Sequence, residues 1–296
     1  MNISACPNSP NQLVVETRQP GAPVSESEIS IGVLSESQDG LSLIRGQCFK
    51  RPDGAINGLL WESRDKVLIS HSSGVVLYNS SAAEPQTAIR LADCVGAVAD
   101  PHHAFTVVSA SGKSLCLWDM RTSGVGYAFK TSNFFGITSL DVNPNSENIV
   151  ATGGADGRIS IWDIRGNLVE PLKSFEGHNH TVTQVKYNPV HDELLLSAGT
   201  DCAVNLWCVL SVSSNPSRHK QLIEKPDFSR SRRKSNEDST CGHQDGLIQK
   251  YNRHEDSVYR ASWGCGSSAW AFATASYDGL AMFNSVPGTE RQRIMM

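Results

Sequence analysis

Short apolar segments that each end in an aromatic residue recur along the chain. They are VVLY ending at Tyr78, LCLW at Trp118, ISIW at Trp162, VNLW at Trp207 and LAMF at Phe283, so successive aromatic residues lie 40, 44, 45 and 76 positions apart. Alternation of apolar and polar residues indicates a half-buried β-strand, and a short continuous apolar run indicates a strand that is buried on both faces. The pattern therefore predicts a repeating unit made of strands.

One repeat, residues 175–208, shows the elements of this unit. Residues 181–187 alternate, residues 194–197 (LLLS) form a continuous apolar run, and residues 203–207 make a third strand that ends at a tryptophan. Asn188-Pro189 predicts the turn between the first two strands, because proline has no backbone donor and disfavours helix in the preceding residue. A period of about 40–45 residues with one four-stranded sheet per period is typical of a β-propeller. Such a fold favours a binding scaffold over an enzyme.

Two copies of the third strand end in the dipeptide Trp-Asp, at Trp118-Asp119 and Trp162-Asp163. In this respect the chain resembles the WD-repeat (WD40) proteins. The resemblance implies an all-β propeller, in which we recognise about five blades.

The resemblance also implies a buried polar network in the best-preserved repeat. His178, Ser197, Asp201 and Trp207 stand where WD repeats carry a hydrogen-bonded tetrad, in which the histidine bridges the aspartate and the hydroxyl, and the hydroxyl accepts the indole N–H. Tryptophan only donates, aspartate only accepts, and histidine and serine do both, so every member can be satisfied when buried.

A second copy has the same spacing. His254 and Phe283 are 29 residues apart, as are His178 and Trp207. Thr274 and Asp278 would supply the hydroxyl and the carboxylate, four residues apart, as Thr152 and Asp156 are in the third copy. Phenylalanine has no N–H, so we expect the last tetrad to lack one bond. Asn133 stands where the third copy needs its histidine, and we expect no tetrad in the copies that end at Tyr78 and Trp118.

Candidate chemistry is otherwise sparse. His178 and His254 could be imagined as catalytic bases or metal ligands, but their fixed place in a repeat favours the structural role. His102-His103 has no cysteine or carboxylate nearby at metal-ligand spacing. No GxSxG, Walker or HExxH motif is present. We therefore assign no catalytic, cofactor-binding or metal-binding residue and do not expect an enzyme.

Composition narrows the class of protein further. The 296 residues carry a formal net charge of −4, whereas nucleic-acid binders are usually basic. The eight cysteines include no CxxC pair, which favours a reduced chain. Residues 1–10 lack the layout of a signal peptide, and no apolar run approaches the roughly 20 residues that a membrane span needs. We expect a cytoplasmic protein that reaches membranes only through partners.

Two segments depart from the repeat. Residues 1–50 are rich in Ser, Pro, Gln and Glu, and we expect them to be poorly ordered, with part in a first blade, ahead of the propeller at 51–296. Residues 211–249 predict a long polar loop between the third strand of a blade and its fourth strand at 247–251. Its basic run at 230–234 fits a solvated loop or, alternatively, a contact with phosphate, lipid or an acidic partner. Ser235 behind that run is a candidate phosphorylation site.

The C-terminal half resembles one family in particular, the EARP and GARP complex-interacting proteins. The matching stretches are Val185–Ser214, Arg253–Trp263 and Trp270–Pro287, and the polar insert between the last two blades is shared. The resemblance covers the chain from about Gly54 to its end. It implies a non-enzymatic adaptor that associates with the EARP and GARP tethering complexes. It further implies recruitment to endosomes and the trans-Golgi network, with roles in endosomal recycling, retrograde transport and dense-core granule handling.

The front of the chain departs from this family. The family's propeller has seven blades, whereas the sequence shows five repeats. An open arc of blades would leave strand edges unpaired, which invites aggregation unless they are covered.

The competing interpretation is a substrate receptor of a cullin–RING ubiquitin ligase. Both WD dipeptides continue to an arginine, Arg121 and Arg165, as WDxR, which resembles receptors that dock on a ligase adaptor through arginine–carboxylate pairs. The arginines could equally cap their own blades. With Arg253 and Glu255, which also lie where predicted strands end, they are our candidate partner-binding residues.

Overall fold

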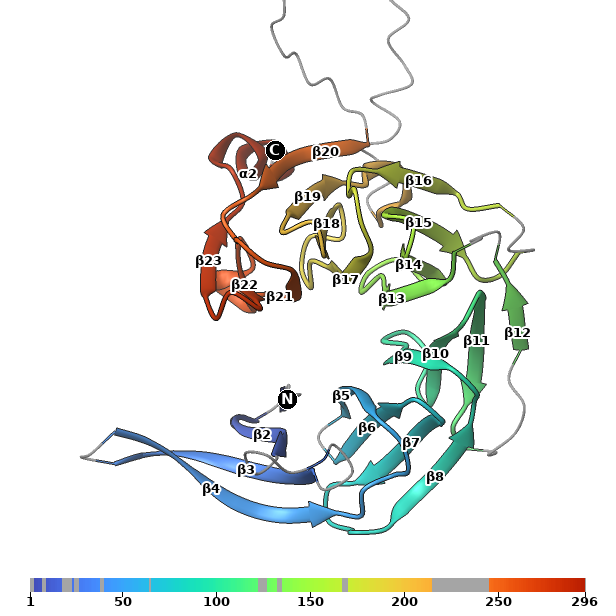
Figure 1. The fold of residues 1–296 in the computed structure, drawn as a ribbon, viewed down its shortest axis with the longest axis vertical. Coiled ribbons are helices and arrows are strands. Elements are labelled where there is room, and N and C mark those ends of the chain that lie inside the picture. Colours follow the sequence, from blue (N-terminus) through green and yellow to red (C-terminus); the bar gives the residue numbers. More distant parts are fainter. Residues whose placement is uncertain are drawn as a thin grey trace, which may run out of the picture. The chain divides into compact units, whose positions relative to one another are not determined.

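The computed structural model describes residues 3–6, 9–17, 23, 27–37, 40–63, 65–121, 127–131, 135–166, 170–214 and 245–295. The strands in these residues form six sheets in chain order, five with four strands and the last with three (Figure 1). We number them sheet 1 (β1–β4), sheet 2 (β5–β8), sheet 3 (β9–β12), sheet 4 (β13–β16), sheet 5 (β17–β20) and sheet 6 (β21–β23). This succession of antiparallel meanders is the blade pattern of a WD40-like β-propeller.

The chain divides into two compact units, Met1–Val142 with Gly166–Pro171, and Asn143–Arg165 with Leu172–Met296. The strands of the first unit are β1 (Ile3–Cys6), β2 (Ser9–Thr17), β3 (Glu28–Ser37), β4 (Gly40–Phe49), β5 (Ile56–Ser63), β6 (Lys66–His71), β7 (Gly74–Asn79), β8 (Pro85–Arg90), β9 (Cys94–Ala99), β10 (Thr106–Ser111), β11 (Ser114–Asp119), β12 (Tyr127–Lys130) and β13 (Ile137–Val142).

The second unit carries the strands β14 (Ile149–Gly154), β15 (Arg158–Asp163), β16 (Lys173–Glu176), β17 (Val182–Tyr187), β18 (Leu194–Gly199), β19 (Val204–Cys208), β20 (Gly246–Tyr251), β21 (Val258–Trp263), β22 (Ala271–Ser276) and β23 (Ala281–Ser285). Its helices are the 3₁₀ turns η2 (Leu210–Val212) and η3 (Gly266–Ser268) and the α-helix α2 (Gly288–Met295).

Within each unit, the first strand of a sheet packs on the first or second strand of the sheet before it. In the first unit β1 contacts β5, β5 contacts β9, and β9 contacts β13; in the second unit β14 contacts β17, and β17 contacts β21. In the first unit, buried side chains such as Ile29, Trp61 and Tyr78 pack between the sheets and form the core. Apolar area removed from water in this way is the main favourable contribution to the stability of the fold.

The second unit shows why a blade's second strand has a continuous apolar run. Every residue of β18 is buried, because sheet 5 has a neighbouring sheet on each face. One face places Leu195 with Trp207 and residues of sheet 4, whereas the other places Leu194 and Leu196 against Trp263 and Phe272 of sheet 6. The run predicted at residues 194–197 therefore reflects burial on both faces.

The number of blades differs from the prediction. The sequence predicted about five, but the structure has six, because residues 3–49 form a complete sheet 1 where we expected mostly poor order. Its β3–β4 hairpin has ten residues in each strand. These strands lack the closing Trp or Tyr that marks the other four-stranded sheets, so the aromatic period did not reveal them. The fourth strand predicted at 247–251 corresponds to β20, which pairs with β19.

The described helices are short. None of them is both long enough and apolar enough to cross a membrane. Helix α2 packs Ile294 into the core that sheets 5 and 6 share.

Candidate functional site

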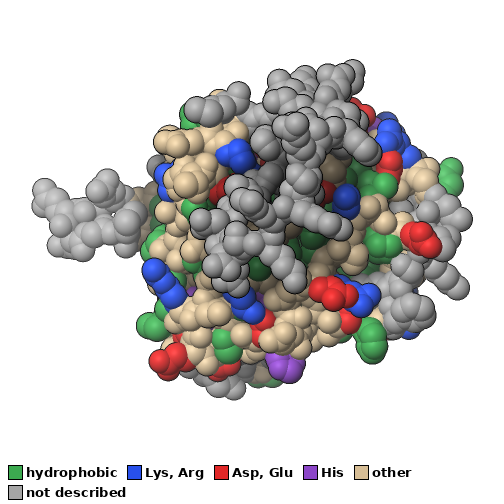
Figure 2. All heavy atoms as spheres, turned by 90° about the horizontal axis from the view of Figure 1, so that it is seen from above, with side chains coloured by type: hydrophobic (Ala, Val, Ile, Leu, Met, Phe, Trp, Pro, Cys, Tyr) green, Lys and Arg blue, Asp and Glu red, His purple; other side chains and the backbone are tan. Residues whose placement is uncertain are grey.

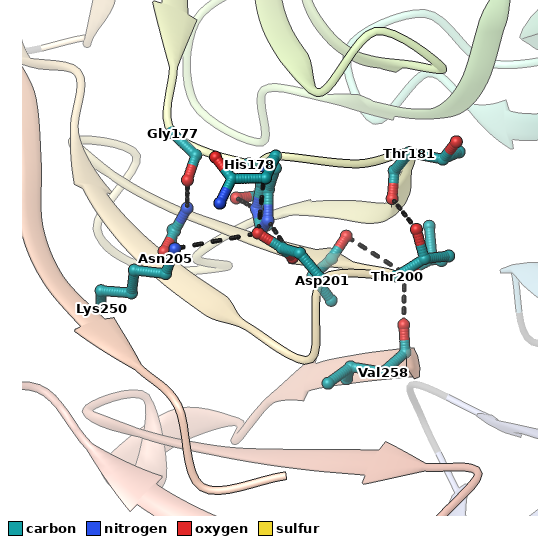
Figure 3. A network of polar contacts seen from close by, with 12 residues as sticks. Gly177, His178, Thr181, Thr200, Asp201, Asn205, Lys250 and Val258 are labelled. Atoms are coloured by element: carbon teal, nitrogen blue, oxygen red, sulfur yellow. Dashed lines mark hydrogen bonds and ion pairs between the residues drawn. The ribbon is translucent and has the colours of Figure 1, made fainter. Parts of the chain in front are cut away.

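A chain of hydrogen-bonded side chains holds the end of sheet 5 at which the turn between β18 and β19 lies (Figure 3). His178 lies before β17, Ser197 on β18, Asp201 in the turn after β18, and Trp207 on β19. His178 Nδ1 is 2.8 Å from Asp201 Oδ1, and His178 Nε2 is 2.7 Å from Ser197 Oγ. Trp207 Nε1 donates to the same Ser197 Oγ at 2.8 Å. The four residues named from the sequence therefore form one continuous network.

A neutral His178 can make both hydrogen bonds of this network. When Nδ1 carries the proton and donates to Asp201, Nε2 is free to accept from the Ser197 hydroxyl. Burial lowers the pKa of His178, and the hydrogen bond from the histidine to Asp201 opposes that effect without reversing it. Burial also disfavours the charged Asp201 carboxylate, but donation from His178 and from the backbone N–H of Asn179 holds its pKa below the ordinary value. The network therefore fixes the turn at Asp201.

Sheet 6 carries three of the four members. His254 Nδ1 lies 3.0 Å from Asp278 Oδ2, and its Nε2 lies 2.8 Å from Thr274 Oγ1. Asp278 also accepts the backbone N–H groups of Glu255 at 3.1 Å and Leu280 at 2.8 Å. The carboxylate therefore ties the loop before β21 to the turn between β22 and β23.

The fourth position of this network is not Phe283. In sheet 5, Trp207 pairs with Leu195 of β18; the equivalent residue of β22, Phe272, pairs with Asn284. The predicted position was wrong by one residue, because the histidine and the hydroxyl are separated by 20 residues in sheet 6 and by 19 in sheet 5. Because successive side chains along a strand point to opposite faces of the sheet, a shift of one residue places the side chain on the opposite face. Phe283 is accordingly 81% exposed.

Sheets 3 and 4 keep the bond between tryptophan and hydroxyl. Trp118 Nε1 donates to Ser109 Oγ at 2.8 Å, and Trp162 Nε1 donates to Thr152 Oγ1 at 2.8 Å. Sequence reasoning missed the pair in sheet 3, although a hydroxyl nine residues before the tryptophan was a usable signal. In sheet 4 the turn residue Asp156 accepts the backbone N–H of Arg158. Asn133, expected at the histidine position of that blade, lies outside the described residues.

Both WDxR arginines bind the aspartate of their own motif. Arg121 donates from Nε and Nη2 to Asp119, with the closest contact at 2.7 Å, and Arg165 binds Asp163 in the same way at 2.6 Å. The hydrogen bonds from Arg121 lower the pKa of Asp119 to about 2, and those from Arg165 lower the pKa of Asp163. The arginines lie exposed on the surface. Their geometry matches the capping role, because the Nε–Nη2 edge of each guanidinium, which could bind a partner's carboxylate, already binds the aspartate of its own motif.

The candidate partner-binding residues are divided between the two units. Arg121 belongs to the first unit and the other three belong to the second. Arg165 follows the end of β15, whereas the turn of Asp156 precedes that strand. Arg253 and Glu255 follow β20, whose last residue Tyr251 pairs with Val204 beside the Asp201 turn. Arg253 and Glu255 therefore lie at the end of the blades that bears the polar networks, and Arg165 lies at the opposite end.

The long polar loop is anchored at both ends by carboxylates that the sequence did not single out. Ser211 donates from its backbone N–H to Asp245 Oδ1 at 2.9 Å, and its hydroxyl also reaches Asp245. Ser214 donates from its backbone N–H to Asp192 Oδ2 at 2.7 Å. Lys173 pairs with Asp245 at 3.2 Å. Residues 215–244, which include the candidate phosphorylation site Ser235, lie outside the described residues.

The described residues contain no cluster of side chains arranged as metal ligands. No group of three or more His, Cys, Asp or Glu residues in the described ranges is arranged to hold a metal. On the face shown in Figure 2, Lys and Arg side chains are interspersed with Asp and Glu. The seven cysteines in the described part of the chain are free thiols.

Comparison with known proteins agrees with this architecture. Residues 55–207 match the family model described as "EIPR1 beta-propeller". The chain is 35% identical over 239 residues to "EARP and GARP complex-interacting protein 1" of Rattus norvegicus, which covers 80% of this chain and 59% of the relative. It is 34% identical over 197 residues to "EARP-interacting protein 1" of Caenorhabditis elegans, which covers 66% of this chain and 52% of the relative.

A plant relative matches over a similar length. "WD repeat-containing protein DWA2" of Arabidopsis thaliana is 28% identical over 243 residues, which covers 79% of this chain and 64% of the relative. The chain thus spans about half to two thirds of the length of these relatives. With a family model matched over more than half of its residues and a blade structure to accompany it, the chain belongs to the EIPR1 β-propeller family.

Proposed function

We propose that this chain is a non-catalytic adaptor that binds the EARP and GARP vesicle-tethering complexes. The observation that carries the proposal is the similarity over 80% of the chain to proteins named for that interaction. The geometry supports it. The histidines, hydroxyls and carboxylates of sheets 5 and 6 bond to one another and fix turns, which leaves the loops between strands as the parts that can meet a partner.

The cellular role follows from the same resemblance. An adaptor of these tethers would act in the cytoplasm and reach endosomes and the trans-Golgi network through its partners. It would serve endosomal recycling, retrograde transport and the handling of dense-core granules. Nucleic acid and direct insertion into a membrane have no place in this proposal.

A pull-down tests the proposal. The 296-residue chain, tagged and expressed in cells, should recover subunits of EARP and GARP, with the rat relative as the positive control. Recovery by the rat protein but not by this chain would contradict the adaptor role for this chain. Recovery of ligase adaptor subunits in place of tether subunits would favour the ubiquitin-ligase alternative.

Charge reversal would then locate the binding end of the blades. Arg253→Glu and Glu255→Arg change exposed side chains beside the polar networks, and Arg165→Glu changes an exposed residue at the opposite end. We expect the first pair to weaken tether recovery and Arg165→Glu to leave it unchanged. Equal recovery by all three variants would exclude these residues from the interface.

A further inference from the structure

Lys66, Phe105 and Arg121 meet at one end of sheets 2 and 3, which pack against each other within the first unit. Lys66 begins β6 of sheet 2, whereas Phe105 precedes β10 of sheet 3 and Arg121 follows β11 of the same sheet. The ammonium nitrogen of Lys66 lies 3.5 Å from the centroid of the Phe105 ring, and the guanidinium carbon of Arg121 lies 5.9 Å from that centroid. Two cations therefore share one aromatic ring, whose negative face attracts them.

Phe105 has a backbone conformation that bulky residues rarely adopt. Its φ angle is +65°, in the left-handed region. Sheet 4 has Asn148 at this position with a φ of +63°, and asparagine tolerates this conformation well. The two positions correspond because the same backbone hydrogen bond fixes them, from Met120 N–H to Phe105 O at 2.8 Å and from Ile164 N–H to Asn148 O at 2.9 Å. Sheet 3 therefore keeps a strained phenylalanine where asparagine would fit, and such strain is characteristic of functional sites.

Both cations keep hydrogen-bond donors for a further partner. Arg121 binds Asp119 through Nε and Nη2, and its Nη1 makes no hydrogen bond within the described residues. In the same part of the chain, the Lys66 ammonium has no carboxylate at ion-pair distance. Other exposed cations, such as Lys50 and Arg158, do pair with a carboxylate. The group of Lys66, Phe105 and Arg121 therefore presents unused N–H donors beside a partly exposed aromatic ring.

Sheet 4 has the same arginine without the aromatic ring. Arg165 binds Asp163 through Nε and Nη2, just as Arg121 binds Asp119. The residue before β14 is Asn148, which has no aromatic face to offer. Asp163 raises the pKa of Arg165, and the nearby negative charge of Glu147 adds to that effect. Sheet 4 is therefore an internal control, in which the arginine is already surrounded by carboxylates.

We propose that Lys66, Phe105 and Arg121 form a docking site for an acidic segment of a partner protein. A glutamate or aspartate of the segment accepts hydrogen bonds from Lys66 Nζ and Arg121 Nη1, and an apolar neighbour of that acid packs on the exposed part of the Phe105 ring. Charge-assisted hydrogen bonds of this kind are short and strong. One unpaired ammonium and one free guanidinium nitrogen suit a carboxylate side chain, whereas membrane surfaces are bound by larger basic clusters. The inference goes beyond the tether proposal and does not depend on which protein carries the segment.

A peptide titration tests the docking site. The probes are two synthetic peptides, one with Glu-Leu-Glu at its centre and one with Gln-Leu-Gln in its place. Their binding to the 296-residue chain is followed by NMR of the Phe105 ring and the Lys66 side chain after selective labelling. We expect saturable shifts with the glutamate peptide, which weaken as the ionic strength rises. The glutamine peptide should bind at least about tenfold more weakly, and equal binding of the two peptides would overturn the proposal.

Protein variants separate a docking role from a packing role. Lys66→Gln keeps most of the side chain but removes its charge, and Phe105→Asn introduces the residue that sheet 4 has at this position. Each should weaken binding of the glutamate peptide at least about tenfold. Phe105→Asn should not lower Tm, because asparagine relieves the left-handed conformation. Unchanged peptide binding by Lys66→Gln would overturn the proposal, whether or not Phe105→Asn folds.

The control variant and two further probes identify other occupants. Arg165→Gln changes the matched arginine of sheet 4 and should bind the glutamate peptide as the original chain does; a loss equal to that of Lys66→Gln would overturn the proposal. Tighter binding of phosphatidylserine vesicles or of inorganic phosphate than of the peptide would also overturn it, in favour of a membrane or a free anion. So would a concentration-dependent dimer that Lys66→Gln abolishes, because a second copy of the chain would then supply the acidic segment.

Discussion

Sheets 5 and 6 share the same histidine-centred polar network but differ at the tryptophan position and in the outer strand. Each has a histidine between a turn aspartate and a strand hydroxyl. Sheet 5 then adds Trp207 and a fourth strand, whereas sheet 6 has Asn284 at the tryptophan position and no described fourth strand. The difference shows that the network fixes the turn at one end of a blade whether or not the outer strand is present. The tryptophan connects that network to the apolar core.

The largest expected effect separates the two sheets at the tryptophan position. Trp207 is 2% exposed and packs on Phe175, so Trp207→Ala should lower the free energy of unfolding by about 3–5 kcal/mol. Asn284→Ala should lower it by less than about 1 kcal/mol, because Asn284 is only partly buried. Urea unfolding of the two variants measures both quantities. Equal losses would contradict the predicted difference between the two sheets at this position.

A smaller effect is expected at the aspartate of sheet 5. Asp201→Ala leaves His178 and the N–H of Asn179 without their acceptor and should lower the free energy of unfolding by about 1–3 kcal/mol. Asp201→Asn keeps one acceptor oxygen and serves as the matched control, with a smaller expected loss. A neutral Asp201→Ala would contradict the structural role of the network.

These results bear on how much of the molecule its sequence reveals. His178, Ser197, Asp201 and Trp207 were identifiable because a buried polar network demands particular donors and acceptors at fixed places. The same rule placed His254 and Asp278. It failed at Phe283, because spacing was counted from the histidine across a loop. Counted from the hydroxyl, the tryptophan position lies ten residues on in sheet 5, and the same step from Thr274 reaches Asn284.

Sheet 1 and the anchored loop were harder to predict for a different reason. Strands β1 to β4 contain serines and glutamates among their apolar residues. Apolar residues such as Val14 and Ile29 are recognisable as core residues only once they pack against the neighbouring sheet. Asp192 and Asp245 are far apart in sequence, and nothing in the sequence distinguishes them from acidic residues on the surface. Their role appears only when η2 and β20 bring the ends of the loop together.

The pH dependence should be a weaker effect in the same region. Burial holds the pKa of His178 below its ordinary value, so the unfolded chain takes up a proton at this residue before the folded chain does. The contribution of His178 to the free energy of unfolding is therefore fully present above about pH 6.5. It falls as the pH drops below that value, by at most about 1.4 kcal/mol per pH unit. His178→Gln should reduce the change in unfolding midpoint between pH 7 and pH 5. An unchanged pH dependence in this variant would contradict a buried, neutral His178.

The smallest effect is expected at Phe283, where the comparison of the two sheets is most direct. Leu206 occupies the equivalent position in sheet 5 and is fully buried, so Leu206→Ala should lower the free energy of unfolding by about 2–5 kcal/mol. Phe283→Thr removes a larger side chain but should change it by no more than about 0.5 kcal/mol, because that side chain already contacts water in the unbound chain. Thermal unfolding of the two variants at equal protein concentration measures the contrast. A large loss in Phe283→Thr would mean that the Phe283 side chain is covered in solution, against its 81% exposure.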